Sequence, residues 1–142
     1  MWIQKKINIV AKARGFHLIT DEILQELADI KNIKIGVLHL FIQHTSASLT
    51  INENADPDVR VDMESYFSRA VVENEPYYRH VLEGSDDMPA HIKAVTLGCE
   101  LTIPIADGQL QLGIWQGVYL CEHRNRAGCR NIIATINGEK NA

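Results

Sequence analysis

Two short segments of this 142-residue chain concentrate side chains that could do chemistry. The first, HTSASLTINENADPDVRVD, runs from His44 to Asp62 and carries one histidine, four hydroxyl residues, two asparagines and four carboxylates. The second, DDMPAHIK, runs from Asp86 to Lys93. Neutral imidazole nitrogens and carboxylate oxygens are suitable ligands for a divalent metal ion. We therefore expect a metal-binding or phosphate-linked site that is assembled from both segments.

Histidines and acids spread along the chain are the residues with the clearest potential for such a site. They are His44, Asp62, His80, Asp87, His91 and Glu122. His44 and His91 form the best pair of metal ligands, because each is expected at the edge of a regular element. We assign a divalent ion, zinc or magnesium, to these two histidines, with a carboxylate such as Asp87 or Glu122 beside them. Ordinary helix capping and hydrogen bonding remain the alternative explanation.

Hydroxyl, guanidinium and amide groups near these residues could hold a phosphorylated substrate. Thr45 and Ser46 begin a run of hydroxyl side chains, although alternating polar positions on a half-exposed strand would give the same pattern. Arg124 lies in a basic turn, and a guanidinium group can bind phosphate through two parallel hydrogen bonds. A solvated basic turn explains Arg124 equally well. Gln116 interrupts an otherwise apolar strand, which indicates either a buried amide with a defined partner or the wall of a pocket.

The composition excludes several functional classes. The formal net charge is -4 and the pI is near 5.8, which argues against a general nucleic-acid binder, because such proteins are normally basic. No stretch of 18 apolar residues is present, so no membrane-spanning helix is expected. Three cysteines without a CxxC pair, and no apolar run at the N-terminus, predict reduced thiols and a cytoplasmic location. The length predicts one domain over residues 1–142.

Hydrophobic periodicity places the elements that must position these side chains. Helical spacing of apolar residues predicts three helices at about 21–31, 57–70 and 88–97. Asp56 is expected to cap the second helix and Asp87 the third, each with a proline in the first turn that follows. Apolar runs predict strands at about 3–9, 17–19, 33–42, 47–52, 99–105, 109–122 and 131–136. Asp107-Gly108 predicts a tight hairpin between the strands on either side. The nearly continuous apolar run over 33–42 predicts a central strand that is covered on both faces.

The order of these elements predicts the fold class. Helices gather in the first two thirds of the chain and strands in the last third. This order favours an α+β domain, with a mixed and largely antiparallel sheet packed with about three helices, over a doubly wound parallel fold. His44 then follows the central strand while His91 lies early in the third helix, so the two segments must meet in the tertiary structure or across a subunit boundary.

Four long runs of the sequence closely resemble a known protein family. They are HTSASLTINENADPDVRVD (44–62), EGSDDMPAHIKA (83–94), LTIPIADGQLQLGIWQG (101–117) and YLCEHR (119–124). They resemble the YjbQ family, whose members are described as secondary thiamine-phosphate synthases or simply as uncharacterised. The resemblance covers essentially the whole chain. It implies a compact α+β subunit, a homotrimer, and polar residues gathered in clefts near the subunit boundaries.

The resemblance also implies which residues form the site. His44, Asp62, Asp87, His91 and Glu122 are expected to be catalytic, with His44 and His91 on the metal. The remaining positions that match the family's motifs are expected to bind the substrate, and Arg124 joins them as the anion-binding candidate of the basic turn. These expected substrate-binding residues are Thr45, Ser46, Asn52, Asn54, Gln116 and Arg124, with Trp115 beside them.

The activity implied by the resemblance is that of a transferase. Such an enzyme joins a hydroxymethylpyrimidine diphosphate to a thiazole phosphate and releases pyrophosphate, which could be a promiscuous side activity. The expected partner is thus a small phosphorylated heterocycle, with no nucleic acid and no membrane. The competing interpretation is a trimeric protein that binds a metal or a phosphorylated metabolite without turnover. A hydrolase acting on a phosphorylated small molecule is a third possibility.

Overall fold

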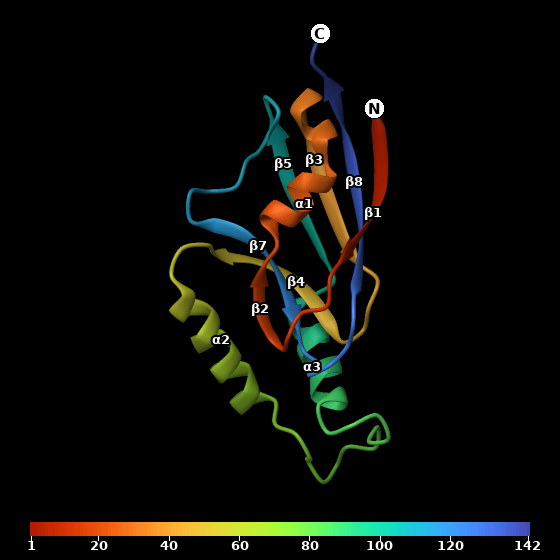
Figure 1. The fold of residues 1–142 in the computed structure, drawn as a ribbon, viewed down its shortest axis with the longest axis vertical. Coiled ribbons are helices and arrows are strands. Elements are labelled where there is room, and N and C mark those ends of the chain that lie inside the picture. Colours follow the sequence, from red (N-terminus) through yellow and green to blue (C-terminus); the bar gives the residue numbers. More distant parts are fainter.

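A computed structural model describes all residues from 1 to 142, and it consists of two antiparallel sheets and three α-helices (Figure 1). The larger sheet has the strand order β1 (Trp2–Ile9), β8 (Arg130–Lys140), β3 (Ile33–Ile42), β5 (Glu100–Ala106), β6 (Gln109–Leu110). The smaller sheet has the order β2 (Gly15–Leu18), β7 (Gln116–Glu122), β4 (Ala47–Glu53). The helices are α1 (Thr20–Glu26), α2 (Pro57–Ala70) and α3 (Asp87–Leu97), with a 3-10 turn η1 (Ala28–Asn32) after α1. The predicted α+β class is confirmed.

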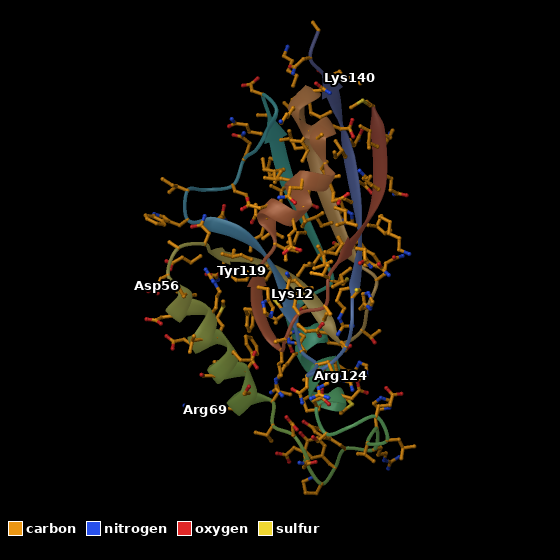
Figure 2. The ribbon with its side chains drawn as sticks, viewed as in Figure 1. Lys12, Asp56, Arg69, Tyr119, Arg124 and Lys140 are labelled. Atoms are coloured by element: carbon orange, nitrogen blue, oxygen red, sulfur yellow. The ribbon has the colours of Figure 1, made fainter.

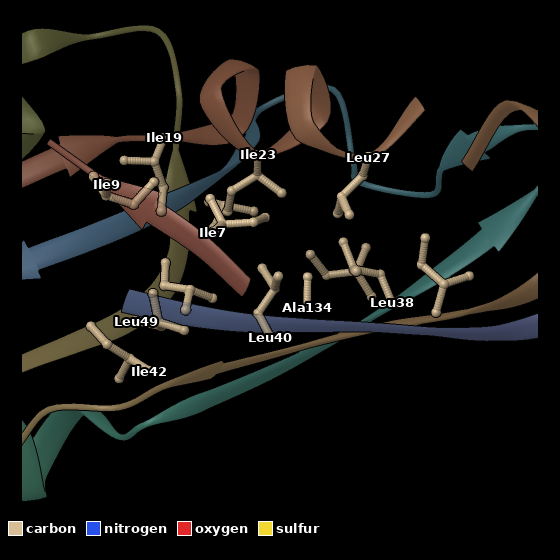
Figure 3. Close-up of a cluster of buried hydrophobic side chains, with 14 of the residues drawn as sticks. Ile7, Ile9, Ile19, Ile23, Leu27, Leu38, Leu40, Ile42, Leu49 and Ala134 are labelled. Atoms are coloured by element: carbon tan, nitrogen blue, oxygen red, sulfur yellow. The ribbon is translucent and has the colours of Figure 1, made fainter. Parts of the chain in front are cut away.

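The main core lies between the inner face of the larger sheet, α1 and the smaller sheet (Figure 3). Its 19 buried residues are almost all isoleucine, leucine and valine, and they come from both sheets. Ile23 of α1 and Leu40 of β3 are each at most 1% exposed. Along β8 buried residues alternate with half-buried ones, as expected for a strand with one buried face. Burial of this surface joins the two sheets into one unit.

The central strand β3 has the predicted bounds, but the prediction that both its faces are covered is wrong. Leu38 and Leu40 are fully buried, whereas Ile35, Val37 and Phe41 are 58%, 38% and 40% exposed. These three residues lie on the outer face of the larger sheet, which no helix covers in Figure 1. An antiparallel sheet can leave one face uncovered in this way, so a continuous apolar run does not by itself require two covered faces.

Two predicted elements are each divided in the structure. The helix expected over 21–31 ends at Glu26, because Leu27 leaves the helical conformation, and η1 follows. The strand expected over 109–122 is broken between Leu110 and Gln116, and its two parts join different sheets. The change of sheet falls at the stretch that carries Gly113, a residue without a side chain to pack in a strand.

The predicted local signals at two other positions are confirmed. Asp107 and Gly108 form the two-residue turn between β5 and β6, and both have positive φ angles of 49° and 75°. This is the conformation that an Asp-Gly hairpin turn favours. Asp56 caps α2, because its Oδ1 accepts a hydrogen bond from the backbone N–H of Asp58 at 2.9 Å, and Pro57 follows at the first helical position.

The start of α3 differs from the prediction in a way that matters for the site. Asp87 was expected to cap this helix, but Asp86 occupies the capping position and Asp87 is the first helical residue. Neither carboxylate accepts a capping hydrogen bond, because both face the turn after β7 instead. The side chain of Asp87 is therefore available for other partners. None of the three helices is long and apolar enough to cross a membrane.

A second, smaller cluster lies between the smaller sheet and α2, and it contains a buried histidine. Phe16, Tyr119 and Cys121 form the cluster, and the ring of His123 packs edge-on against Phe16. His123 is 2% exposed, and its Nε2 lies 2.8 Å from the Oγ of Ser48. Burial lowers the pKa of His123 to about 3, and the nearby positive charge of Lys93 contributes in the same direction. This imidazole stays neutral in the folded protein at any moderate pH.

We predict that His123 makes the protein less stable in mild acid. Between pH 7 and pH 5 the unfolded chain protonates this histidine near pH 6.5, while the folded protein with its pKa of about 3 does not. His123 alone should therefore remove roughly 1–2 kcal/mol of unfolding free energy over this interval. Urea unfolding of the wild type and of His123→Gln at both pH values measures the effect. An equal loss of stability in the two proteins would contradict it.

Candidate functional site

Three titratable side chains converge at the start of α3. His80, Asp87 and His91 each offer one ligand atom, and these atoms lie within 4.8 Å of one another. The Nε2 of His80 lies 2.7 Å from the Oδ2 of Asp87, and the Nε2 of His91 lies 3.2 Å from the same oxygen. His91 is one turn after Asp87 on α3, whereas His80 comes from the irregular segment before the helix. Two imidazoles and one carboxylate thus point at a common position.

The other nitrogen of His91 determines what this position can hold. Its Nδ1 donates a hydrogen bond to the backbone carbonyl of Thr45 at 2.9 Å. In the neutral imidazole the proton then sits on Nδ1, so the Nε2 lone pair faces the Oδ2 of Asp87. Nε2 is thus the nitrogen of His91 that is suited to bind a metal ion beside this carboxylate oxygen. A hydrogen bond from the distal ring nitrogen to a backbone carbonyl is also the usual outer-shell support of a metal-bound histidine.

Asp87 is the buried member of the cluster, with 1% of its surface exposed. Its second oxygen, Oδ1, accepts a hydrogen bond from the Nη1 of Arg124 at 2.7 Å. Burial alone would raise the pKa of Asp87, but the hydrogen bond from His80 and the charges of His91 and Arg124 outweigh it and hold the pKa below its ordinary value. The carboxylate is therefore ionised and each of its oxygens is occupied by a different kind of partner.

His44 lies near this cluster but outside it. It precedes β4, and its Nε2 accepts a hydrogen bond from the backbone N–H of Asn131 at 2.8 Å. This contact places the proton of the neutral ring on Nδ1. Burial and the nearby charge of Arg130 lower the pKa of His44, so the ring is a neutral hydrogen-bond donor at pH 7. The structure groups His80, rather than His44, with Asp87 and His91.

His44 and His91 nevertheless line the same hollow, which has a volume of about 310 Å³. The segment that joins β3 to β4 forms one wall of the hollow, and α3 with the two residues after it forms the other. The lining residues are His44, Thr45, Ala47, His91, Ala94, Val95, Gly98 and Cys99. No lysine or arginine belongs to this lining, so a phosphorylated ligand bound there needs another source of positive charge. The two segments that the sequence singled out do meet at this hollow.

A buried ion pair holds the segment that carries His44 and Thr45. Glu122 is fully buried, and its Oε1 accepts a hydrogen bond from the Nε of Arg130 at 2.7 Å. The Nη2 of Arg130 also donates to the backbone oxygen and to the Oγ of Ser46, at 3.2 and 3.0 Å. Ser46 and Glu122 are thus bonded within the protein, and they support the wall of the hollow.

The other predicted substrate-binding residues lie at the far end of β7. Gln116 begins this strand and Glu122 ends it, so the two are about 20 Å apart. Gln116 accepts a hydrogen bond from the N–H of Gly113, and Asn54 donates to the backbone oxygens of Ile114 and Gln116. These amides stabilise the 111–116 turn of the same chain. The structure therefore does not bring Asn54 and Gln116 to the histidine cluster within one subunit.

Three further candidates are also separate from the cluster. Asn52 is exposed on β4, where its Oδ1 accepts from the N–H of Glu53. Asp62 is exposed on α2 and lines a shallow hollow with Tyr66 and Arg69. Trp115 is 62% exposed in the turn before β7. A role for these residues in the histidine site remains a prediction, and it would need a neighbouring subunit.

The sequence offered His80 as a candidate for the site, but the metal-ligand pair was assigned to His44 and His91 instead. His80 lies in an acidic irregular segment, seven residues before Asp87, and no periodicity links such a residue to a helix. The available signal was the spacing of two histidines around an acidic pair, His80 and His91 on either side of Asp86-Asp87. This spacing became informative only when the chain before α3 was seen to fold back onto Asp87.

The sequence matches one family over nearly its full length. The profile described as UPF0047 protein YjbQ-like matches residues 5–139. This chain belongs to that family. The UPF0047 protein YjbQ of Escherichia coli O157:H7 is 57% identical over 139 residues, which is 98% of this chain and 100% of the relative. A UPF0047 protein of Synechocystis is 43% identical over 136 residues, covering 96% of this chain and 92% of the relative. The resemblance stated from the sequence motifs is confirmed.

Solved structures of similar proteins share the fold. An uncharacterised conserved protein of this family from Clostridium acetobutylicum aligns with a TM-score of 0.82 at 33% identity, over 94% of this chain and 99% of its own. A YbjQ-like protein of unknown function from Sulfolobus solfataricus aligns with a TM-score of 0.85 at 25% identity, over 98% and 99% of the two chains. The two-sheet architecture that positions the histidines is therefore common to distant relatives.

We predict that Cys99 controls access to the hollow. Its thiol is exposed and lines the hollow with His91, whereas Cys129 is exposed elsewhere and Cys121 is buried with a pKa raised to about 12. Alkylation by N-ethylmaleimide should modify Cys99 and Cys129, leave Cys121 unmodified, and slow the later reaction of His91 with diethyl pyrocarbonate. Peptide mass spectrometry measures both reactions.

The matched variants for this prediction are Cys99→Ser and Cys129→Ser. In Cys99→Ser the alkylating agent should leave the rate at His91 unchanged, whereas in Cys129→Ser it should still slow that rate. Equal rates at His91 with and without alkylation of Cys99 would show that this thiol does not lie at the entrance.

Proposed function

We propose that this protein is a metal-dependent transferase with thiamine-phosphate synthase-like activity. The observation that supports the proposal is the convergence of His80, Asp87 and His91 on one position beside a hollow of about 310 Å³. In the proposed reaction a thiazole nitrogen forms a bond to the methylene carbon of a hydroxymethylpyrimidine diphosphate. The carbon–oxygen bond to the diphosphate breaks, and its electron pair leaves on pyrophosphate.

The departing pyrophosphate is the part of this reaction that most needs stabilisation. A divalent ion supplies the charge that neutralises a leaving diphosphate. The hollow has no lysine or arginine in its lining, so this charge is not available from its own side chains. Two imidazole nitrogens and one carboxylate oxygen suit zinc or a similar first-row ion, whereas magnesium prefers oxygen ligands throughout. We therefore favour zinc, manganese or cobalt over magnesium at this site.

The protein's own residues have defined roles in the proposal. His80, Asp87 and His91 would hold the ion, in place of the pair His44 and His91 expected from the sequence. His44 is fixed by Asn131 as a neutral donor through Nδ1, and it is suited to donate a hydrogen bond to a ligand oxygen or ring nitrogen in the hollow. A set of donors fixed before the ligand arrives favours the charge that develops during the reaction.

Removal of one metal ligand should abolish both metal binding and turnover. We predict that Asp87→Asn and His91→Gln lose bound metal and lower the rate of thiamine-phosphate formation by more than about 100-fold, because even outer-shell partners of such ligands typically contribute 10–100-fold. Metal analysis of the purified proteins and mass spectrometry of the product measure the two quantities. Asp29→Asn, an exposed substitution in η1, serves as the control and should retain both.

The outcomes of this experiment separate two candidate functions. Metal in the wild type together with product that requires His91 supports the transferase. If the wild type contains metal but none of its metal-loaded forms gives product, the result would favour a protein that binds a metal or a phosphorylated metabolite without turnover. Product that is unchanged in both variants would exclude the site as the place of reaction.

The proposal includes a homotrimer in the cytoplasm, and the outer face of the larger sheet supports the assembly. Ile35, Val37 and Phe41 of β3 are exposed there, and the register of β1, β8 and β3 places the exposed Trp2 in the same row as Val37. A row of large apolar side chains on an uncovered sheet face is typical of a surface that another subunit covers. The three unpaired cysteines fit a reducing compartment.

We predict that Val37→Glu disrupts this assembly. The carboxylate would lie in the middle of the outer face, and its burial against a second subunit without a partner would cost several kcal/mol per site. Light scattering coupled to gel filtration should give a mass of three chains for the wild type and one chain for the variant. Val61→Glu, on the exposed side of α2, is the control and should retain the wild-type mass. A wild type of one chain would exclude the trimer.

A further inference from the structure

The guanidinium group of Arg124 is bonded through all three of its nitrogens to groups around the start of α3. Its Nε donates to the Oδ2 of Asp86 at 3.0 Å, and its Nη1 donates to the Oδ1 of Asp87 at 2.7 Å. Its Nη2 donates to the backbone oxygen of Glu83 at 2.9 Å. Hydrogen bonds of this kind between ionised groups are about twice as strong as neutral ones. The guanidinium group that we expected from the sequence to bind substrate is therefore already engaged within the protein.

Two carboxylates also fix the backbone around Arg124. The N–H of Arg124 donates to the Oε2 of Glu122 at 3.1 Å, and the N–H of Asn125 donates to the Oδ2 of Asp86 at 2.8 Å. Glu122 is itself held by the buried Arg130. The turn after β7 and the first turn of α3 are thus connected by a set of bonds in which Arg124 is central. In Figure 2 Arg124 lies beside α3, at the opposite end of the molecule from Lys140.

We propose that Arg124 is a positioning residue, which sets the carboxylate of Asp87 for a divalent metal ion. This inference rests on the metal site of the proposed function. Arg124 donates only to the Oδ1 of Asp87, so this bond fixes the plane of the carboxylate. The other oxygen, Oδ2, is then directed at His80 and His91. Without this bond the buried carboxylate could rotate, and a ligand whose orientation is not fixed binds a metal ion more weakly.

The charges at the start of α3 support the same role. Asp86 and Asp87 are adjacent carboxylates, and together they would place two negative charges at one buried position. Arg124 bonds to both, which leaves one net negative charge for the metal ion. Arg124 also keeps the metal ion away from Asp86 and from the Oδ1 of Asp87, because its own positively charged guanidinium group already lies on that side. The ion is therefore directed to the side where the two histidines lie.

Cobalt(II) titration of the purified, metal-free protein tests this role, because its visible absorption reports both affinity and ligand geometry. We expect Arg124→Gln to lower the Co²⁺ affinity by about 10–100-fold, the usual effect of removing an outer-shell partner, and to change the absorption spectrum of the saturated protein. Arg124→Lys should lose less affinity, because one charged donor remains. Arg126→Gln, an exposed arginine of the same turn, is the matched control and should bind Co²⁺ as the wild type does.

A chemical rescue separates positioning from a general loss of folding. In Arg124→Ala, millimolar guanidinium ion should restore most of the lost Co²⁺ affinity, whereas it should have no such effect in Asp87→Asn. A variant that has only lost stability would not recover its affinity and spectrum with this small cation. Thermal unfolding of each variant in the presence of a chelator measures the stability directly.

The possible results separate this inference from the proposed function. A wild type that binds Co²⁺ through His91, with unchanged affinity and spectrum in Arg124→Gln, would overturn the role of Arg124 and leave the metal site intact. A wild type that binds no Co²⁺, or binds it equally well in His91→Gln, would overturn both. Weaker binding in Arg124→Gln, partial retention in Arg124→Lys and rescue by guanidinium ion together support the inference.

Discussion

The carboxylate of Asp87 is the group on which the arrangement of the site depends. It is almost fully buried, and an unpaired buried charge would cost several kcal/mol. The protein compensates this charge with Arg124 on one oxygen and with two imidazoles on the other. Each partner comes from a different part of the chain, so the requirement to pair one carboxylate brings the 71–86 segment, α3 and the turn after β7 together.

A second buried charge connects this site to the sheets. Glu122 ends β7, and it pairs with Arg130 at the start of β8, which also bonds to Ser46. The smaller sheet, the larger sheet and the segment that precedes β4 therefore share one ion pair. Replacing such a pair by apolar residues is often neutral for stability, whereas breaking it leaves an unpaired charge. In this protein the ion pair between Glu122 and Arg130 fixes the position of Thr45, and the backbone carbonyl of Thr45 in turn orients His91.

Much of the fold could be predicted from local patterns, and part of the site could be too. The bounds of β3, the Asp107-Gly108 turn and the capping of α2 by Asp56 follow from short-range preferences. Membership of the YjbQ family was also apparent from the motifs, and the same motifs supplied Asp87 and His91 as site candidates, which the structure places side by side. The separation of Gln116 from the histidines was not apparent from the sequence. It arises because the chain breaks after Leu110 and the two halves of one apolar run join different sheets.

The sequence by itself determined most of the elements that form and which residue types could bind a metal ion or a phosphate. Periodicity, caps and turns act between near neighbours, so they are encoded locally. Only the tertiary structure decided that His80 joins Asp87, that Nε2 of His44 is occupied by Asn131, and that the guanidinium of Arg124 is bonded to acids of α3. These contacts join residues 7, 87 and 38 positions apart, and long-range packing with the pairing of buried charge selects them rather than any pattern along the chain.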